Sequence, residues 1–331
     1  MGIIIPVFVD DMTLISKSKP AIQAFIKELS THFKLRDLGP TTQLLGFKID
    51  RDRPSRTLSL SQRQYILDML ERYKMSDCKP VATPMSPGSK LSTSMAPSSP
   101  EDLAFMKTVP YLNAVGSLMY LAITTRPDIS YAVGVLARFN SNPGPIHWTA
   151  VKHVFRYLKG TLDLKLEYGP SAEGSSEVFL TYSDADHGGY TDNGKSTGGY
   201  MVKLGTGAVS WSSKLQSMVA LSTTEAEYIS AVEAAKEIMW MRQFMGELGY
   251  PPSSSSVLLM DNQSAISVSK NPEHHGRMKH LDLRWYWLRD VVDLGLIRPV
   301  FVPTEDMAAD ILTKALMRPY VEKCRRIMGL M

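Results

Sequence analysis

Four acidic residues in the second half of the chain have the type and placement that divalent-metal chemistry requires. Two end predicted strands and two lie in predicted helices; they are Asp184, Glu227, Asp261 and Asp310. Burying a lone carboxylate costs on the order of several kcal/mol unless it is paired or bound to a cation. Magnesium prefers oxygen ligands, and two ions roughly 4 Å apart can activate a water and stabilise the leaving oxygen of a phosphodiester. Each acid alone is better explained as a cap or a solvated residue, but four in this order favour one metal site.

The start of a long predicted helix offers two candidate ligands, Glu225 and Glu227. Residues 222–225 read Ser-Thr-Thr-Glu, the pattern of a capping box in which the glutamate reaches back to the start of the helix. Glu227 lies above the small residues Ala231 and Ala234 on its helical face, where another group can approach closely. We therefore assign the metal role to Glu227 and the structural role to Glu225.

The elements that must position these acids follow the order β-β-β-α-β-α-α-β-α, which indicates an α/β fold. Strands are predicted at 178–184, 198–204, 207–213, 257–261 and 297–302. Helices are predicted at 223–248, 263–270, 280–294 and 306–316.

The first half of the chain has shorter elements. Strand-type runs at 3–9 and 12–16 meet at Asp10-Asp11 and predict a hairpin. Further strands are predicted at 43–50 and 57–61, and helices at 20–33, 62–74, 109–124, 127–139 and 145–160. We divide the chain into five segments: 1–78, a Pro/Ser-rich linker at 79–101, a helical region at 102–170, an α/β domain at 178–317 and a C-terminal tail at 318–331.

The composition is that of an ordinary globular protein, with 44% hydrophobic residues, 21% charged residues and a net charge of +4. Two distant cysteines, Cys78 and Cys324, build neither a disulfide framework nor a zinc ribbon. No apolar run reaches the roughly 20 residues that span a bilayer, and the N-terminus lacks the basic start of a signal peptide. We expect an intracellular protein, cytoplasmic or nuclear, that is neither secreted nor membrane-bound.

Several ordered motifs resemble those of copia-type retrotransposon polyproteins, over nearly the whole chain. They run from Thr125 to Ile129, Arg156 to Thr161, Tyr182 to Asp186, Ser222 to Tyr228, Asp261 to Ala265, Lys279 to Arg284 and Ala309 to Lys314. The resemblance places the chain at the end of the reverse transcriptase, with its palm end and thumb, followed by the ribonuclease H domain.

The resemblance implies a ribonuclease H fold, a mixed five-stranded sheet with helices. It implies that Asp184, Glu227, Asp261 and Asp310 hold two Mg²⁺ ions, with Mn²⁺ as a substitute, and cut the RNA strand of an RNA–DNA hybrid. Unlike many ribonucleases H, this chain has no histidine after His280, and Glu305 or Asp306 are candidates for its proton-shuttling role.

The N-terminal Phe8-Val9-Asp10-Asp11 resembles the Tyr-x-Asp-Asp hairpin of a polymerase palm. Because the chain begins almost at this hairpin, we expect Asp10 and Asp11 to be a polymerase remnant without independent activity. Candidate partners are the hybrid and either the upstream polymerase segment or a full-length copy.

Two basic clusters have more than one interpretation. Arg277, Lys279, His280 and Arg284 can contact nucleic acid phosphates, or they belong to a solvated loop; a zinc site is disfavoured because no cysteine lies near. Lys152, His153, Arg156 and Lys159 form either a nucleic-acid-binding face or a solvated helix face.

The main alternative function is a decayed transposon fragment that binds nucleic acid without catalysis. A nuclease or integrase of other specificity on the same fold is a third possibility.

Overall fold

A mixed five-stranded sheet forms the centre of the second half of the chain. The structure is a computed structural model that describes residues 2–170, 179–270 and 284–331. The strand order is β11-β10-β7-β8-β9, with bounds Phe179–Ala185 (β7), Thr197–Leu204 (β8), Gly207–Leu215 (β9), Ser256–Met260 (β10) and Ile297–Phe301 (β11). The first three strands in sequence pair antiparallel, whereas β10 runs parallel to both β7 and β11. The expected fold class, an α/β fold with a mixed five-stranded sheet, is confirmed.

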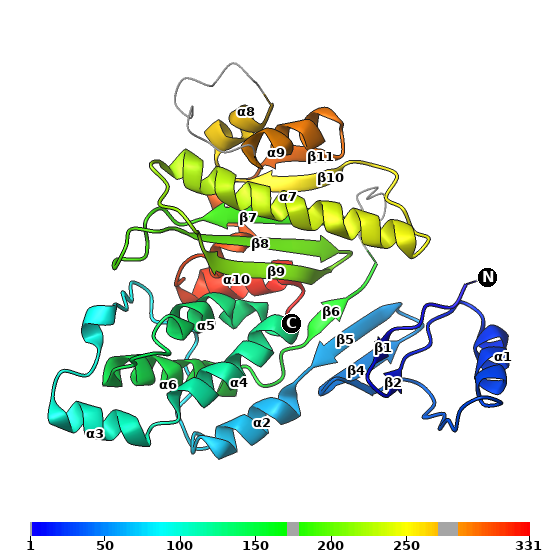
Figure 1. The fold of residues 1–331 in the computed structure, drawn as a ribbon, viewed down its shortest axis with the longest axis horizontal. Coiled ribbons are helices and arrows are strands. Elements are labelled where there is room, and N and C mark those ends of the chain that lie inside the picture. The colour runs from blue at the N-terminus through cyan, green and yellow to red at the C-terminus, as the bar shows by residue number, and fades with distance from the viewer. Residues whose placement is uncertain (1, 171–178, 271–283) are drawn as a thin grey trace.

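Helices cover both faces of this sheet (Figure 1). One face packs against α7 (Thr223–Glu247), α8 (Gln263–Lys270) and α9 (Arg284–Asp293), with Tyr228, Ile238 and Leu258 in a shared core. The other face packs against the helical region and the C-terminal segment. Strands that are buried on both faces read as nearly continuous apolar runs, which explains the Val-Leu-Leu-Met run in β10.

The helical region precedes the sheet and shares a core with it. Its elements are α2 (Arg63–Arg72), η1 (Thr93–Met95), α3 (Pro100–Thr108), α4 (Tyr111–Thr124), η2 (Pro127–Ile129), α5 (Ser130–Ala137) and α6 (Pro145–Lys159). Leu118 of α4, Tyr182 of β7 and Met328 near the C-terminus belong to one buried cluster. Trp211 of β9 also donates a hydrogen bond of 2.7 Å to the carbonyl of Ala122. The helical region and one face of the sheet are therefore one packed unit.

The Pro/Ser-rich stretch lies against the helical region, with Met85 and Leu91 buried. Basic side chains of α6 hold it in place through main-chain carbonyls. His153 bonds the Thr83 carbonyl at 3.0 Å and Arg156 donates to the Lys79 carbonyl at 2.7 Å. This face of α6 is therefore at least partly occupied by the chain itself.

The N-terminal lobe, residues 2–58, has no buried side chain. It contains the hairpin β1 (Val7–Phe8) and β2 (Asp11–Met12), followed by α1 (Lys19–Leu29). A second, four-stranded sheet joins β3 (Gln43–Leu44), β4 (Phe47–Asp52) and β5 (Thr57–Ser61) to β6 (Leu166–Tyr168), which comes from beyond the helical region. The predicted hairpin is present, but α1 ends four residues before position 33, where Phe33 is exposed.

Two C-terminal segments differ from the elements predicted there. Residues 306–316 were expected to form one helix. Instead, two short 3₁₀ helices occupy this region, η4 (Thr304–Asp306) and η5 (Ala308–Leu312). Residues 318–331, expected to be a tail, contain α10 (Arg318–Met328), whose Val321, Cys324 and Met328 are buried.

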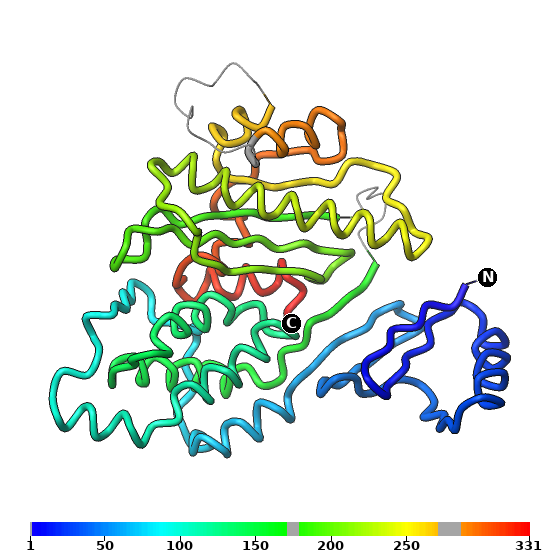
Figure 2. Tube along the Cα trace, in the orientation of Figure 1, coloured from blue at the N-terminus to red at the C-terminus, as the bar shows by residue number. Residues whose placement is uncertain are grey.

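The end of the chain is fixed beside β6 (Figure 2). Gly329 ends α10 with a φ of 78°, in the left-handed region that glycine tolerates. A Cβ there would lie 2.8 Å from the carbonyl oxygens of Glu167 and Thr206, so this close approach also requires glycine. Within the described ranges, no helix combines the length and the apolar character needed to cross a membrane.

Candidate metal centre

Three carboxylates from three elements meet at one edge of the five-stranded sheet. Asp184 lies near the end of β7, Asp261 directly follows β10, and Glu227 lies in the second turn of α7. Because β7 and β10 are parallel neighbours, their carboxyl ends lie at the same edge. One ligand oxygen from each of the three residues lies within 4.8 Å of the others.

Asp310 reaches the same neighbourhood from the other face of the sheet, but it is not part of this group of three. It lies in η5, which packs directly against β8 at Gly199, the strand partner of Asp184. A Cβ on Gly199 would lie 2.7 Å from the Leu312 Cβ, so the glycine allows this close contact. A lysine, Lys314, connects Asp310 to the group.

The Lys314 ammonium lies 2.9 Å from Asp310 Oδ1 and 3.6 Å from Asp184 Oδ2. The hydroxyl of Thr313 donates a hydrogen bond to the same Asp184 oxygen. Thr304 donates to Asp261 Oδ2 at 2.9 Å. Hydrogen-bond donors and one cation therefore hold part of the cluster in place.

Glu227 is the least compensated member of the cluster. It is 6% exposed, and its Oε2 has no hydrogen-bond partner among the described residues. Burial, together with the nearby Asp184 and Asp261, raises the pKa of Glu227 far above its usual range. A hydrogen bond from the Ala185 backbone lowers this pKa, but by less. Buried acceptors in proteins normally have a partner, so this oxygen is available to a ligand such as a metal ion.

The other acids follow the same trend. Burial raises the pKa of Asp261, and Asp184 adds to this rise. Burial and Asp184 also raise the pKa of Asp310, although Lys314 opposes the shift. Burial disfavours the Lys314 charge, but Asp184 and Asp310 outweigh it and hold the Lys314 pKa above its usual range. Without further cations, the site thus carries more carboxylates than it can keep ionised.

Glu225 and Glu227 occupy different surroundings, although they are separated by a single residue. Ser222 accepts a hydrogen bond from the Glu225 backbone at 3.1 Å, and the Glu225 carboxylate accepts one from the Leu221 backbone at 2.8 Å. The glutamate therefore caps the helix one residue before the position that a capping box predicts. Glu227 points into the cluster instead.

The donor set fits a hard divalent cation. All three grouped ligands are carboxylates, and Mg²⁺ selects oxygen ligands while keeping several waters. One oxygen of Glu227 has no hydrogen-bond partner among the described residues, and the pKa values of Glu227 and Asp261 are raised. Both features fit a site that binds a positive ion.

The remaining predicted site residues do not join this cluster. Asp10 and Asp11 are exposed in the N-terminal hairpin, which lies towards the opposite end of α7 (Figure 1). Lys17, just after the hairpin, contacts the Tyr250 ring beyond the C-terminus of α7, with 5.4 Å to the ring centroid. Arg277, Lys279 and His280 lie outside the described residues, and Arg284 begins α9 without a described side chain. Glu305 and Asp306 lie in η4, where Asp306 pairs with Lys323 at 2.7 Å.

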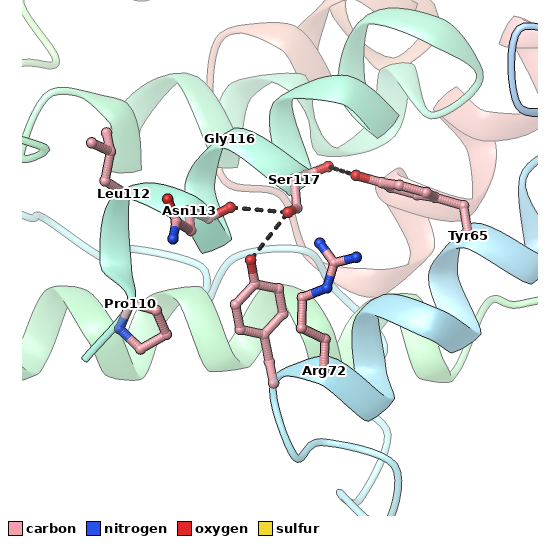
Figure 3. Close-up of a pocket in the computed structure, with 8 residues that line it drawn as sticks. Tyr65, Arg72, Pro110, Leu112, Asn113, Gly116 and Ser117 are labelled. Atoms are coloured by element: carbon pink, nitrogen blue, oxygen red, sulfur yellow. Dashed lines mark hydrogen bonds between the residues drawn. The ribbon is translucent and has the colours of Figure 1, made fainter. Parts of the chain in front are cut away.

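A separate pocket lies between α2 and α4 (Figure 3). Tyr65, Tyr73 and Ser117 line it, and the Tyr73 hydroxyl lies 3.1 Å from the Ser117 hydroxyl. None of the four predicted metal ligands lines this pocket, so it provides no access to the carboxylates.

Three residues in contact with the carboxylates were not predicted to be site residues, although two of them belong to the motif that ends at Lys314: Thr304, Thr313 and Lys314. For Lys314 a signal existed, since it follows Asp310 by four residues, the spacing that brings side chains together on a helix. No comparable local spacing links Thr304 to Asp261, which it meets across the parallel strands β10 and β11.

Comparisons with known proteins agree with the resemblance found in the motifs. Residues 1–87 match the family model described as reverse transcriptase (RNA-dependent DNA polymerase). The Retrovirus-related Pol polyprotein from transposon TNT 1-94 of Nicotiana tabacum is 47% identical over 99% of this chain, which spans only 24% of that polyprotein. The putative transposon Ty5-1 protein of Saccharomyces cerevisiae is 34% identical over 71% of this chain and 74% of its own length.

A solved structure of the foamy viral protease-reverse transcriptase in complex with RNA/DNA hybrid covers 91% of this chain and 36% of its own, with 14% identity and a TM-score of 0.42. The sequence relatives are the stronger finding, because one of them aligns with 99% of the chain. The chain belongs to the family of retrotransposon Pol polyproteins.

Proposed function

We propose that this chain is a magnesium-dependent endonuclease that cleaves the RNA strand of RNA–DNA hybrids, as part of a retrotransposon reverse transcriptase and ribonuclease H. The observation that carries the proposal is the convergence of Asp184, Glu227 and Asp261 within 4.8 Å at one sheet edge. Membership of the Pol polyprotein family supports the choice of nucleic acid as substrate.

The residues of the chain have separate tasks in this proposal. Asp184, Glu227 and Asp261 hold one ion, and Asp184 with Asp310 holds a second. Bound divalent ions supply an activated water and stabilise the leaving oxygen of the phosphodiester. Thr313 and Thr304 orient the Asp184 and Asp261 carboxylates through hydrogen bonds, so that these ligands are fixed before an ion arrives.

The direct test is a cleavage assay with purified chain, Mg²⁺ and a hybrid labelled on its RNA strand. We expect short RNA products, the same products with Mn²⁺, and no cleavage without a divalent ion. Asp261→Asn should abolish cleavage while hybrid binding persists. Asp163→Asn, at an acid whose side chain is 87% exposed and lies outside the cluster, is the matched control and should retain activity.

The substrate controls separate the alternatives. Cleavage of double-stranded DNA or RNA in preference to the hybrid would indicate a nuclease of other specificity. Wild-type chain that binds the hybrid and leaves it intact would sink the proposal and favour a decayed, nucleic-acid-binding fragment.

We also propose three assignments that lie outside the carboxylate cluster. Asp10 and Asp11 remain assigned as a polymerase remnant, supported by the family match over residues 1–87. The upstream polymerase segment, or a full-length copy, remains the proposed protein partner. An intracellular location, cytoplasmic or nuclear, is supported by the free thiols of Cys78 and Cys324.

A further inference from the structure

The Lys314 ammonium is the only cation that the described structure places against the carboxylate cluster. It spans two acids from different elements, Asp184 of β7 and Asp310 of η5. The local backbone directs it there, since the Lys314 amide bonds the Asp310 carbonyl at 3.0 Å and so turns the side chain back over Asp310.

This contact differs from the surface ion pairs nearby. Lys323 pairs with Asp306, but that carboxylate is 48% exposed. Asp184, in contrast, is 2% exposed, and the Asp310 side chain is 12% exposed. The Lys314 side chain is 40% exposed, but the carboxylates that it contacts are shielded from water and interact with it more strongly than an exposed carboxylate does.

The position of Lys314 conflicts with a divalent ion at the same place. An ion held between Asp184 and Asp310 would place a second positive charge against the two carboxylates that the ammonium now contacts at 3.6 and 2.9 Å. In the group formed by Asp184, Glu227 and Asp261, the ammonium pairs with Asp184 alone among the described residues, so Glu227 and Asp261 stay open to an ion. The two halves of the cluster therefore differ in their readiness for an ion.

We propose that Lys314 is the resident cation of the Asp184–Asp310 half of the site and that it must be displaced before a second divalent ion binds there. It is a positioning residue, which holds the two carboxylates together in the ion-free protein. The first ion binds the Asp184–Glu227–Asp261 half, and the second binds more weakly because it competes with the ammonium. This inference rests on the proposed function, since it concerns the same metal ligands.

The test is a calorimetric titration of the full chain with Mn²⁺, with bound ions counted by electron paramagnetic resonance, in the absence of nucleic acid. We expect one tighter and one weaker ion for the wild-type chain. Lys314→Met keeps most of the stem and removes the charge, so the second ion should bind about tenfold more tightly, equivalent to about 1.4 kcal/mol. The thermal midpoint of the ion-free protein should fall, because Asp184 and Asp310 lose their cation.

Two further variants keep the test decisive if Lys314→Met folds poorly. Lys314→Arg retains the charge and adds a bidentate donor, so the second ion should bind no more tightly than in the wild type. Lys323→Met removes the lysine of the exposed pair with Asp306 and should leave both ions unchanged.

The outcomes separate this inference from the function on which it rests. A wild-type chain that binds no divalent ion would contradict both this inference and the nuclease proposal. Normal first-ion binding, with second-ion affinity unchanged or lowered in Lys314→Met, would overturn the inference and leave the nuclease proposal intact.

Discussion

Glu227 is the residue on which the charge balance of the site depends most. It is buried, one of its oxygens lacks a partner among the described residues, and its pKa is raised by burial and by two neighbouring acids. A residue that destabilises the ion-free protein in this way is best explained by the ion that it binds when the site is filled. Its neighbour Glu225 is equally buried, but its carboxylate accepts a hydrogen bond from the Leu221 backbone and lies outside the cluster.

Glu227→Gln and Glu225→Gln therefore form a matched pair of substitutions. The first should lower the rate of hybrid cleavage at least about a hundredfold, since even the outer partners of metal ligands affect activity by that much. It should also raise the thermal midpoint of the ion-free protein. The second should retain activity, because glutamine also suits a capping position. Equal losses in both variants, measured by initial rates with a hybrid, would refute the assignment.

The raised pKa values of Glu227, Asp261 and Asp310 make a prediction about pH. An acid whose folded pKa lies above its unfolded value binds its proton more tightly when folded. Its stabilising contribution is complete below the unfolded pKa, near pH 4, and is lost as the pH rises through the folded pKa. The thermal midpoint of the ion-free protein should therefore decrease as the pH rises above about 4, up to a pH of about 7 for Asp310 and about 10 for Glu227.

Magnesium should reverse that trend. Because the ions bind the ionised carboxylates of the folded state, the increase in midpoint at millimolar Mg²⁺ should grow with pH over the same range. Thermal denaturation at several pH values, with Mg²⁺ or with a chelator, measures it. Asp261→Asn should show a smaller increase. A magnesium effect independent of pH would contradict the shifted carboxylates.

At the scale of elements, the sequence predicts well where local pattern and burial agree. The run before Asp261 is apolar and ends at a polar turn, and the strand lies within one residue of its predicted bounds. The capping pattern at 222–225 located the start of α7 and separated Glu225 from Glu227. These features depend on neighbours in sequence, which a single chain displays.

The failures lie where distant contacts decide the conformation. The segment around Asp310 has helical composition, yet it forms the short 3₁₀ helix η5 instead of an α-helix. There it packs closely against β8, at a position where Gly199 has no side chain. The segment 318–331 is rich in charge and looks like a tail, but Val321 and Met328 find a core formed by remote elements. Tertiary packing overrides local propensity in both cases.

A buried ion pair ties three elements together behind the site. Arg126 precedes η2 and pairs with Asp128 at 2.8 Å, with side chains 1% and 0% exposed. Tyr157 of α6 donates to Asp128 at 2.6 Å, and Arg325 of α10 lies 3.2 Å from the Tyr157 hydroxyl. Burial disfavours the Asp128 charge, but Arg126 and Tyr157 outweigh it and hold its pKa below the usual value.

Breaking this ion pair should lower the free energy of unfolding strongly. Asp128→Asn leaves a buried guanidinium without its counter-charge, which costs about 3–5 kcal/mol. Glu322→Gln breaks the exposed pair with Arg318 and should leave the stability nearly unchanged, because solvent screens such a pair. Chemical denaturation of both variants measures the difference. Similar small losses would show that water reaches the Arg126 site.

At the scale of the whole molecule, the core does not follow the proposed division into segments. One buried cluster contains side chains of the helical region, the five-stranded sheet and α10. The boundaries at 102–170 and 178–317 therefore remain proposals about the family's domains, and they do not coincide with separate cores. The N-terminal lobe is different, since residues 2–58 contribute no buried side chain.

This arrangement predicts two levels of stability in one chain. The helical region and the sheet should unfold together in a single calorimetric transition, because their shared core cannot be exposed in halves. The N-terminal lobe should open at much lower cost. Limited proteolysis should cut first in the exposed, irregular residues 34–42, well before any cut within α4 or α6.

The cleaved protein provides the decisive measurement. If the lobe contributes little to the core, the main transition should shift by less than about 2 °C after the cut, because about 1 kcal/mol corresponds to roughly 2–4 °C even in domains of about 150–250 residues. Hybrid cleavage should persist as well, since the carboxylates lie at the other end of α7 from the hairpin. A large drop in midpoint would mean that the lobe supports the core through β5, β6 and the pairing of Asp50 with Lys165, which joins the lobe to residues just before β6.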